Sequence, residues 1–250
     1  SVTIFSTMLA RSLKRIGESG VRGFASSSRD PSVKYDFIPA EEKDKGQIMD
    51  VALNHFLYTE PHSVALGITK DTGKELIDWI VSKSLHYPFC YTIVHKETGK
   101  TIGFRLMSVS HRDHSKDFSP FELDEAKFDE GIQILGTILE GMKHDIWKLQ
   151  PEANKILRRE ITFVHKDHQR QGIAKHLLHL GLDFEKLRLA GYDGIQSEAS
   201  SFANQTLLSK NGYTLLMESQ RKEYTRSDGR PVVFHDSTSS MQLFYRNLRK

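Results

Sequence analysis

The sequence predicts a protein of the α/β class, because strand-like and helix-like segments alternate along most of the chain. A length of 250 residues, with 38% hydrophobic and 27% charged residues, fits one globular domain. The clearest stretch is 158–178. It begins with a segment rich in β-branched and aromatic residues, continues in a short polar turn and leads into a helix-like segment. We therefore expect helices packed on a β-sheet.

The first half of the domain shows two helical patterns followed by a hairpin pattern. A helix is expected over 45–56, and Pro61 should end it, because the residue before a proline avoids the helical region. A second helix is expected over 70–85, where apolar residues recur at helical spacing. The strands expected in this half, from alternation and a Thr-Gly turn, are 35–38, 91–94 and 101–109.

The second half continues the alternation after a polar loop over 111–120. A long helix is expected over 125–149, followed by a strand that ends at Val164. Apolar or small residues recur from Ile173 to Phe184, which predicts one helix there. The remaining expected elements are a strand over 194–199, a short helix around Asn204, a strand over 213–217, a hairpin around 227–230 and a strand over 241–245.

The turn between strand and helix in 158–178 is suited to binding an anion. The first N–H groups of a helix have no internal partner, and the helix dipole adds partial positive charge there. Gly172 allows close approach to the backbone, and Ala174 keeps the next turn uncrowded. Arg170 and Lys175 add formal charge. The pattern predicts a phosphate or pyrophosphate site, with an ordinary strand-to-helix connection as the alternative.

Other classes of protein and site are disfavoured. No Gly-Lys-Ser/Thr follows the turn, as a P-loop requires, and the Rossmann pattern G-x-G-x-x-G is absent. A net charge of +3 argues against a dedicated nucleic-acid binder. No apolar run approaches the roughly 18 residues of a membrane span. The single cysteine, Cys90, excludes a disulfide framework and is expected to be buried. His176 and His179 lack carboxylate partners in the pattern, so we expect no metal.

Residues 1–30 differ in composition from the rest of the chain. They are basic, rich in serine and poor in acidic residues, which is typical of a mitochondrial transit peptide. The alternative is a disordered leader without a targeting role. The globular domain is expected over 34–248, in the cytoplasm, or in mitochondria if the leader is a transit peptide.

The turn resembles a known motif. Gln169-x-x-Gly172-x-Ala174, after a strand that ends in Phe163-Val164, resembles the coenzyme A signature of the GNAT N-acetyltransferases. The strand 194–199, followed by Asn204 and by Gly212-Tyr213, resembles the second half of that family's domain. The resemblance covers 34–248. It implies a twisted, mixed, mostly antiparallel sheet with helices on both faces, in which two central parallel strands splay apart beside the coenzyme.

The resemblance also implies acetyl-CoA as cosubstrate and a set of residues that bind it. In the family, the turn amides hold the pyrophosphate and the end of the strand hydrogen-bonds the pantetheine arm. Carried over by position, the coenzyme-binding residues are Thr162, Phe163, Val164, Gln169, Arg170, Gln171, Gly172, Ile173, Ala174, Lys175 and Asn204.

A second, shorter pattern indicates the branch of the family. Phe56-Leu57-x-x-Glu60-Pro61, followed by Leu66-Gly67, resembles the insect- and nematode-like arylalkylamine N-acetyltransferases. This implies direct acetyl transfer to a primary amine, preferably an arylalkylamine, in a ternary complex. The alternatives are another small amine, such as a polyamine or an amino acid, or a non-catalytic protein that binds coenzyme A.

Three residues are candidates for the chemistry, which requires a base to deprotonate the amine. Glu60 is the first candidate base by resemblance, with a turn carboxylate as the alternative. Glu160 is the second; residues 158, 160, 162 and 164 should share one face of the strand, so Glu160 would face the cleft unless it pairs with an arginine. Ser200 matches a serine near the thioester or caps a helix. The acid tyrosine found in many relatives is replaced by Leu208.

Overall fold

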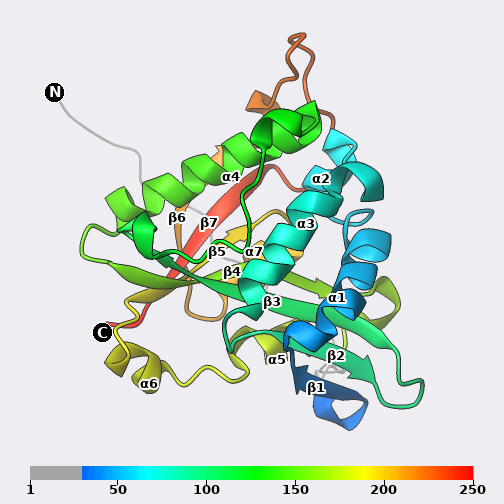
Figure 1. Ribbon diagram of the computed structural model, residues 1–250, viewed down its shortest axis with the longest axis vertical. Helices are drawn as coiled ribbons and strands as arrows, with labels where there is room; N and C mark the ends of the chain where they lie inside the picture. The colour runs from blue at the N-terminus through cyan, green and yellow to red at the C-terminus, as the bar shows by residue number, and fades with distance from the viewer. Residues whose placement is uncertain (1–29, 250) are drawn as a thin grey trace, which may run out of the picture.

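A seven-stranded sheet with the strand order β1-β2-β3-β4-β5-β7-β6 runs through the protein (Figure 1). The computed structural model describes residues 30–249. Neighbouring strands are antiparallel except β4 and β5, which are parallel. The sheet is therefore mixed and mostly antiparallel, as expected. The strands are β1 (Tyr35–Pro39), β2 (Tyr91–His95), β3 (Thr101–His111), β4 (Lys155–Val164), β5 (Gly194–Ala199), β6 (Thr214–Gln220) and β7 (Ser240–Asn247).

Helices cover both faces of this sheet (Figure 1). Helices α1 to α4 pack against one face, where their apolar residues join two core clusters. Helices α5 to α7 pack against the opposite face through two other clusters. The helices are α1 (Lys45–Val51), α2 (Pro61–Leu66), α3 (Lys70–Leu85), α4 (Glu130–Leu149), α5 (Ile173–His179), α6 (Phe184–Leu189) and α7 (Phe202–Ser209).

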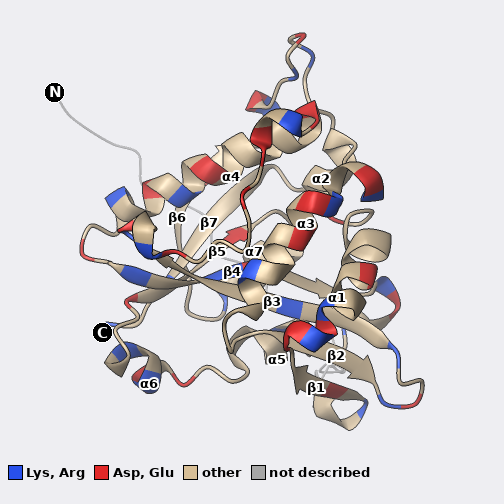
Figure 2. Ribbon diagram, viewed as in Figure 1, with Lys and Arg blue, Asp and Glu red and all other residues tan. Residues whose placement is uncertain are grey.

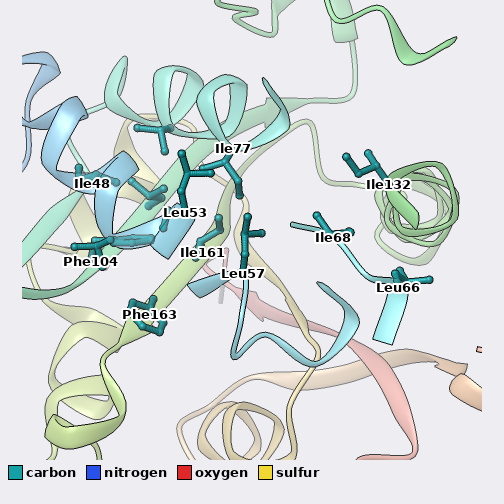
Figure 3. Close-up of a cluster of buried hydrophobic side chains, with 14 of the residues drawn as sticks. Ile48, Leu53, Leu57, Leu66, Ile68, Ile77, Phe104, Ile132, Ile161 and Phe163 are labelled. Atoms are coloured by element: carbon teal, nitrogen blue, oxygen red, sulfur yellow. The ribbon is translucent and has the colours of Figure 1, made fainter. Parts of the chain in front are cut away.

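The largest core cluster fixes the end of β4 (Figure 3). Ile161 and Phe163 of β4 are buried there with Phe104 of β3. Apolar side chains of α1, α2, α3 and α4 cover them, among them Ile77 and Ile132. Full burial of one such side chain stabilises the fold by roughly 1.5–3 kcal/mol. The strand predicted to bind the coenzyme is thus anchored on one side by the core.

The segment after α1 differs from the expectation. The helix expected over 45–56 is present, but its last turn, Ala52–Phe56, is π-helical. Pro61 does more than follow a helix end, because it starts the additional helix α2 with Glu60 as its N-cap. Proline suits the first helical position, since its missing N–H has no partner to lose there.

The single helix expected up to Phe184 is wrong. Helix α5 ends at His179, the chain turns at Gly181, whose φ is 66°, and α6 begins at Phe184. The buried Arg105 of β3 donates to the Leu177 carbonyl at 2.5 Å, and a second buried arginine binds the next carbonyl at 3.1 Å. Guanidinium groups thus satisfy carbonyls at the negative end of the helix, which favours its termination there.

Two smaller expectations are also corrected. The helix expected over 125–149 begins at Glu130, after a separate 3-10 turn. The hairpin expected around 227–230 is a tight turn closed by one isolated bridge between Thr225 and Pro231.

Cys90 is buried, as its sequence context predicted. Its Sγ donates to the Ser84 carbonyl at 3.2 Å, and burial raises the pKa of the thiol to about 11. The side chain is therefore a protonated packing group at neutral pH.

The predicted leader lies outside the described residues, apart from Asp30. Within the described part of the chain, none of the helices combines the length and apolar character that crossing a bilayer requires.

Candidate active site

Strand β4 has a bulge at Glu160. Arg159 pairs with Met107 of β3, whereas Ile161 pairs with Leu106, so Glu160 has no partner residue in the ladder. An extra residue in one strand reverses the alternation of side chains beyond it. Odd-numbered residues of β4 therefore face one side of the sheet before Glu160 and the other side after it.

The bulge overturns the expectation that residues 158, 160, 162 and 164 share one face. Arg158 and Glu160 lie on the face covered by α1 to α4, where they form an ion-pair contact of 3.8 Å. The Thr162 hydroxyl instead contacts Arg159 at 3.2 Å on the opposite face, and Val164 packs there with the cluster that contains α5. The candidate base Glu160 is thus separated by the sheet from the side chains of Thr162 and Val164.

Glu160 is held in a network of buried charges. Its carboxylate accepts a hydrogen bond of 2.5 Å from the Ser108 hydroxyl and lies beside Arg158. Further cations come from α3 and α4, along which acidic and basic residues are interspersed (Figure 2). Burial raises the pKa of Glu160, but these cations, led by Arg158, and the Ser108 hydroxyl lower it to about 2. The pairing with an arginine that the sequence left open is what the structure contains.

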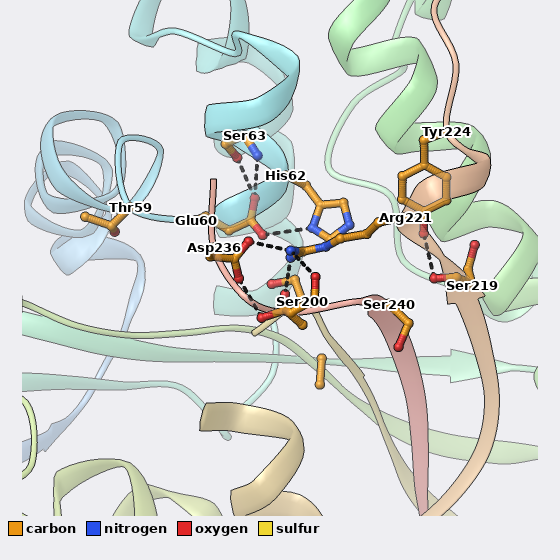
Figure 4. A network of polar contacts seen from close by, with 12 residues as sticks. Thr59, Glu60, His62, Ser63, Ser200, Ser219, Arg221, Tyr224, Asp236 and Ser240 are labelled. Carbon is orange, nitrogen blue, oxygen red and sulfur yellow. Dashed lines mark hydrogen bonds and ion pairs between the residues drawn. The ribbon is translucent and has the colours of Figure 1, made fainter. Parts of the chain in front are cut away.

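Glu60 lies at the N-terminus of α2 and caps it (Figure 4). One carboxylate oxygen accepts hydrogen bonds from the Ser63 N–H at 2.6 Å and the Ser63 hydroxyl at 2.9 Å. The other oxygen, Oε1, lies 3.4 Å from Nδ1 of His62. The side chain is 12% exposed. Glu60 is thus a turn carboxylate, which was the alternative to a base, and its second oxygen lies outside the cap.

The electrostatics of Glu60 keep it ionised. Burial raises the pKa of the carboxyl group, but the nearby His62, the Ser63 N–H and the Ser200 side chain outweigh burial and lower the pKa to about 2. His62 is the largest of the influences that lower this pKa, first through its side-chain contact at 3.4 Å and then through its charge. The carboxylate is therefore available as a base at neutral pH, but it is a weak one whenever His62 is protonated.

Ser200 lies next to Glu60, directly after β5 (Figure 4). The helix N-cap is Ser201, whose hydroxyl accepts from the Asn204 N–H at 3.4 Å, so the capping alternative for Ser200 is wrong. The Ser200 carbonyl accepts a hydrogen bond of 2.6 Å from Arg221. Arg221 is buried and also forms an ion pair with Asp236, so it fixes the chain around Ser200.

The main-chain groups of Thr162 and Val164 face the space beside the end of β4. The pairing of β4 with β5 ends at Arg159 and Ser197. The N–H of His165 donates to β3 at 2.7 Å, and main-chain groups alternate between the two sides of an antiparallel strand. The groups of residues 162 and 164 therefore point away from β3, toward the edge that β5 no longer covers. An extended ligand can add there as a short strand.

The turn after β4 has an unusual backbone. Arg170, with a φ of 61°, is the one non-glycine residue with positive φ in the described chain, and Gly172 follows with 82°. Such turns direct successive N–H groups to one concave side and form anion-binding nests. The Gln169 side chain closes the turn by donating to the Val164 carbonyl at 3.1 Å. Because α5 has only seven residues, its dipole adds little to these local N–H groups.

The remaining candidates in this turn divide by exposure. Ile173 is buried and anchors α5, whereas Gln171 and Lys175 are exposed and Ala174 is half-buried. Asn204 lies half-buried in the first turn of α7. Leu208, at the position of the missing tyrosine, is fully buried. His176 packs on Phe37 and His179 on Phe184, and no three metal-binding side chains cluster in the described range.

Sequence reasoning missed His62 and Arg221. An acidic residue followed by proline is also an N-cap and first-turn signal, which would have predicted α2 and placed His62 beside Glu60. Arg221 follows β6 and contacts residues far from it in the chain, so no local pattern marks it.

Comparisons with known proteins agree with this fold. No family model and no curated protein matches the chain significantly. Among solved structures, arylalkylamine N-acetyltransferase 2 from Aedes aegypti superposes with a TM-score of 0.70 at 16% identity, over 86% of this chain and 99% of that chain. A polyamine N-acetyltransferase from Drosophila melanogaster gives 0.64 at 15% identity, over 85% and 99%. The C-terminal condensation domain of Ebony, in complex with beta-alanyl-dopamine, gives 0.64 at 18% identity, over 86% and 99%.

At identities this low, structural similarity establishes the architecture alone. The seven-stranded sheet, the parallel β4–β5 pair and the helices on both faces all agree with these structures. The resemblance read from the Gln169–Ala174 motif is therefore confirmed at the level of the fold, and the chain has the GNAT fold.

Proposed function

We propose that this protein is an acetyl-CoA-dependent N-acetyltransferase that acts on a primary amine, preferably an arylalkylamine. The observation that carries the proposal is the position of Glu60 and Ser200. A half-buried, ionised carboxylate lies next to a hydroxyl directly after β5, at the end of the parallel strand pair. A base and a hydroxyl at one place suit proton transfer during acyl transfer.

Acetyl-CoA is proposed to bind along β4 and the turn that follows it. Two features of the backbone support this. The main-chain groups of Thr162 and Val164 face the uncovered edge, where an amide-containing pantetheine arm can pair with them. The positive-φ turn at Arg170 and Gly172 suits the pyrophosphate. The proposed coenzyme-binding residues remain Thr162, Phe163, Val164, Gln169, Arg170, Gln171, Gly172, Ile173, Ala174, Lys175 and Asn204.

The reaction is proposed as direct transfer in a ternary complex. Glu60 accepts a proton from the ammonium group, and the free amine nitrogen attacks the thioester carbonyl. The main-chain N–H of Val164, which points toward the uncovered edge, stabilises the oxyanion. The new C–N bond remains as the C–S bond breaks, and the thiolate takes up the second proton of the nitrogen through Ser200 or water.

We assign the base to Glu60 and not to Glu160. The pKa of each carboxyl group is lowered to about 2, so acidity alone does not separate them. Their partners do. Glu160 faces the permanently charged guanidinium of Arg158 and accepts a hydrogen bond from Ser108, whereas the ion-pair contact of Glu60 is with an imidazole, which is not permanently charged.

A second substrate class is also favoured by an observation. Similar structures include an agmatine N-acetyltransferase, with a TM-score of 0.66 at 13% identity, and the polyamine enzyme described above. A polyamine or guanidino amine is therefore the alternative to an arylalkylamine. A protein that binds coenzyme A without turnover is the alternative outside catalysis.

An amine panel tests the proposed function. The purified protein is mixed with acetyl-CoA and with aromatic amines, polyamines or amino acids, and thiol release is followed. Turnover greatest with aromatic amines is expected. Turnover greatest with polyamines would move the assignment to the second substrate class. Tight coenzyme binding without turnover on any amine would refute the proposal that the protein is an enzyme.

A further inference from the structure

His62 is a fully buried histidine with an unusual environment. It follows Glu60 by two residues, is 0% exposed, and neither of its ring nitrogens has a hydrogen-bond partner. Nδ1 nevertheless lies 3.4 Å from Oε1 of Glu60 (Figure 4). The ring packs against two aromatic rings, with centroid distances of 5.0 Å to Phe234 and 5.9 Å to Tyr224.

An imidazole fills this space at a cost in folding free energy. Burial of an unpartnered polar group costs free energy that an apolar side chain of similar size does not cost. Two neighbouring aromatic rings already make the site suitable for leucine or phenylalanine. A buried imidazole with neither nitrogen hydrogen-bonded therefore calls for an explanation other than packing.

A carboxylate lies in direct contact with the His62 ring. The titratable or charged groups around His62 are Glu60 from its own helix, Tyr224, and Arg221, which stacks on Phe234, a ring that also contacts His62. Arg221 would oppose a second positive charge, but its ion pair with Asp236 offsets that effect. The Glu60 carboxylate is therefore the main charge acting on the imidazole.

We propose that Glu60 and His62 form a proton-accepting pair, in which the proton that Glu60 takes from the ammonium group is passed to Nδ1 of His62. This rests on the proposed function of Glu60 as base. The ammonium group loses one proton and becomes a neutral amine, neutral His62 becomes imidazolium, and Glu60 is restored as carboxylate. After product release His62 returns the proton to solvent through Glu60, whose side chain is 12% exposed. His62 acts through Glu60 and is therefore a positioning and proton-holding residue.

The pair explains how a carboxylate of low pKa can serve as a base. While His62 is protonated, Glu60 is a poor proton acceptor, because the positive charge stabilises its ionised form. Once His62 is neutral, that stabilisation is lost and Glu60 accepts protons more readily. Imidazole changes its charge within the neutral pH range, which suits general base catalysis.

Three variants test the pair. His62→Gln keeps a polar side chain that cannot hold a proton, and His62→Phe keeps the packing in case the first variant fails to fold. His144→Gln, at an exposed position on α4, is the matched control. In both His62 variants we expect kcat to fall about 10-fold or more, with KM little changed. We also expect the part of the kcat pH profile that rises through the neutral range to disappear. The control keeps wild-type values.

A second readout does not depend on activity. The Glu60 carboxyl is titrated by carbon-13 NMR, and its pKa is expected to rise from about 2 in both His62 variants, because the largest influence that lowers it is removed. Unchanged kcat and pH profile in both variants, or an unchanged Glu60 titration, would overturn the pair alone. Absence of turnover by the wild type on every amine, with the coupled titration intact, would overturn the proposed function and the proton transfer with it.

Discussion

The Oε2 atom of Glu60 lies 2.6 Å from the main-chain nitrogen of Ser63, so the proposed base is also the N-cap of α2. The cap fixes the carboxylate in one orientation, because the N–H and the hydroxyl of Ser63 hold the same oxygen. The second oxygen is left for His62 and for a substrate proton. A base held by its own helix needs little reorganisation when a substrate binds.

Gly172 should be required for coenzyme binding. Its φ is 82°, and a side chain there is strained by roughly 1–2 kcal/mol. We expect Gly172→Ala to raise the Kd for acetyl-CoA about 10-fold while kcat at saturation is retained. Gly191→Ala is the matched control, because Gly191 has a φ of 80° and no neighbour that a Cβ would meet. Calorimetric titration measures both, and equal Kd values in the two variants would refute the role of the turn.

Glu160 should matter for stability more than for catalysis. Glu160→Gln removes the negative charge that strengthens the hydrogen bond from Ser108 and that pairs with the buried Arg158. We expect the free energy of unfolding in urea to fall by about 1.5–3 kcal/mol, as for hydrogen bonds to charged groups. We expect kcat of the folded variant to change less than about 10-fold, below the usual effect of losing a general base. Loss of activity at unchanged stability would make Glu160 the base instead.

The accuracy of sequence reasoning in this protein depended on the range of the interactions. The Gln169–Ala174 turn was predicted because its determinants, a glycine and its neighbours, are local. The reversal of alternation at Glu160 depends on the register with β3, which no pattern within β4 reveals. The end of α5 depends on Arg105, whose guanidinium reaches the helix from strand β3.

The candidate site followed the same rule. Glu60 and Ser200 were named from motifs, and the structure brings them together. Their supports were not named, since Arg221 reaches Ser200 from 21 residues away in the chain. The motif does not mark His62 although it is adjacent, because a proline signals a helix end as well as a helix start.

Arg221 should be irreplaceable by lysine. Arg221→Lys keeps the positive charge, but one ammonium group cannot bond Asp236, the Thr238 carbonyl and the Ser200 carbonyl with the geometry of a guanidinium. We expect kcat to fall about 10-fold, because Ser200 is released, while acetyl-CoA affinity is unchanged. Steady-state kinetics and coenzyme titration measure the two effects. A variant with wild-type kcat would show that the contact with Ser200 has no role in turnover.

Stability should fall in acid as the carboxylates of Glu60 and Glu160 take up protons. The pKa of Glu60 and of Glu160 lies near 2 in the folded protein, against an ordinary value of 4.5. A pKa lowered by folding contributes stability above the unfolded value, and that contribution is lost as the pH falls through the folded value. We expect the free energy of unfolding to decline between about pH 4.5 and pH 2. Urea unfolding at several pH values measures this, and Glu160→Gln should flatten the decline; an identical slope in the variant would contradict it.

Glu60, as the proposed base, is the residue on which the acetyl transfer depends most. The most direct measurement is the kcat/KM for thiol release from acetyl-CoA, with the best amine of the panel, for the wild type, Glu60→Gln and the matched control Glu185→Gln, an exposed glutamate on α6. We predict a decrease of about 10²-fold or more for Glu60→Gln, as expected for a lost general base, and wild-type values for the control. Wild-type kcat/KM in folded Glu60→Gln would contradict the assignment of the base.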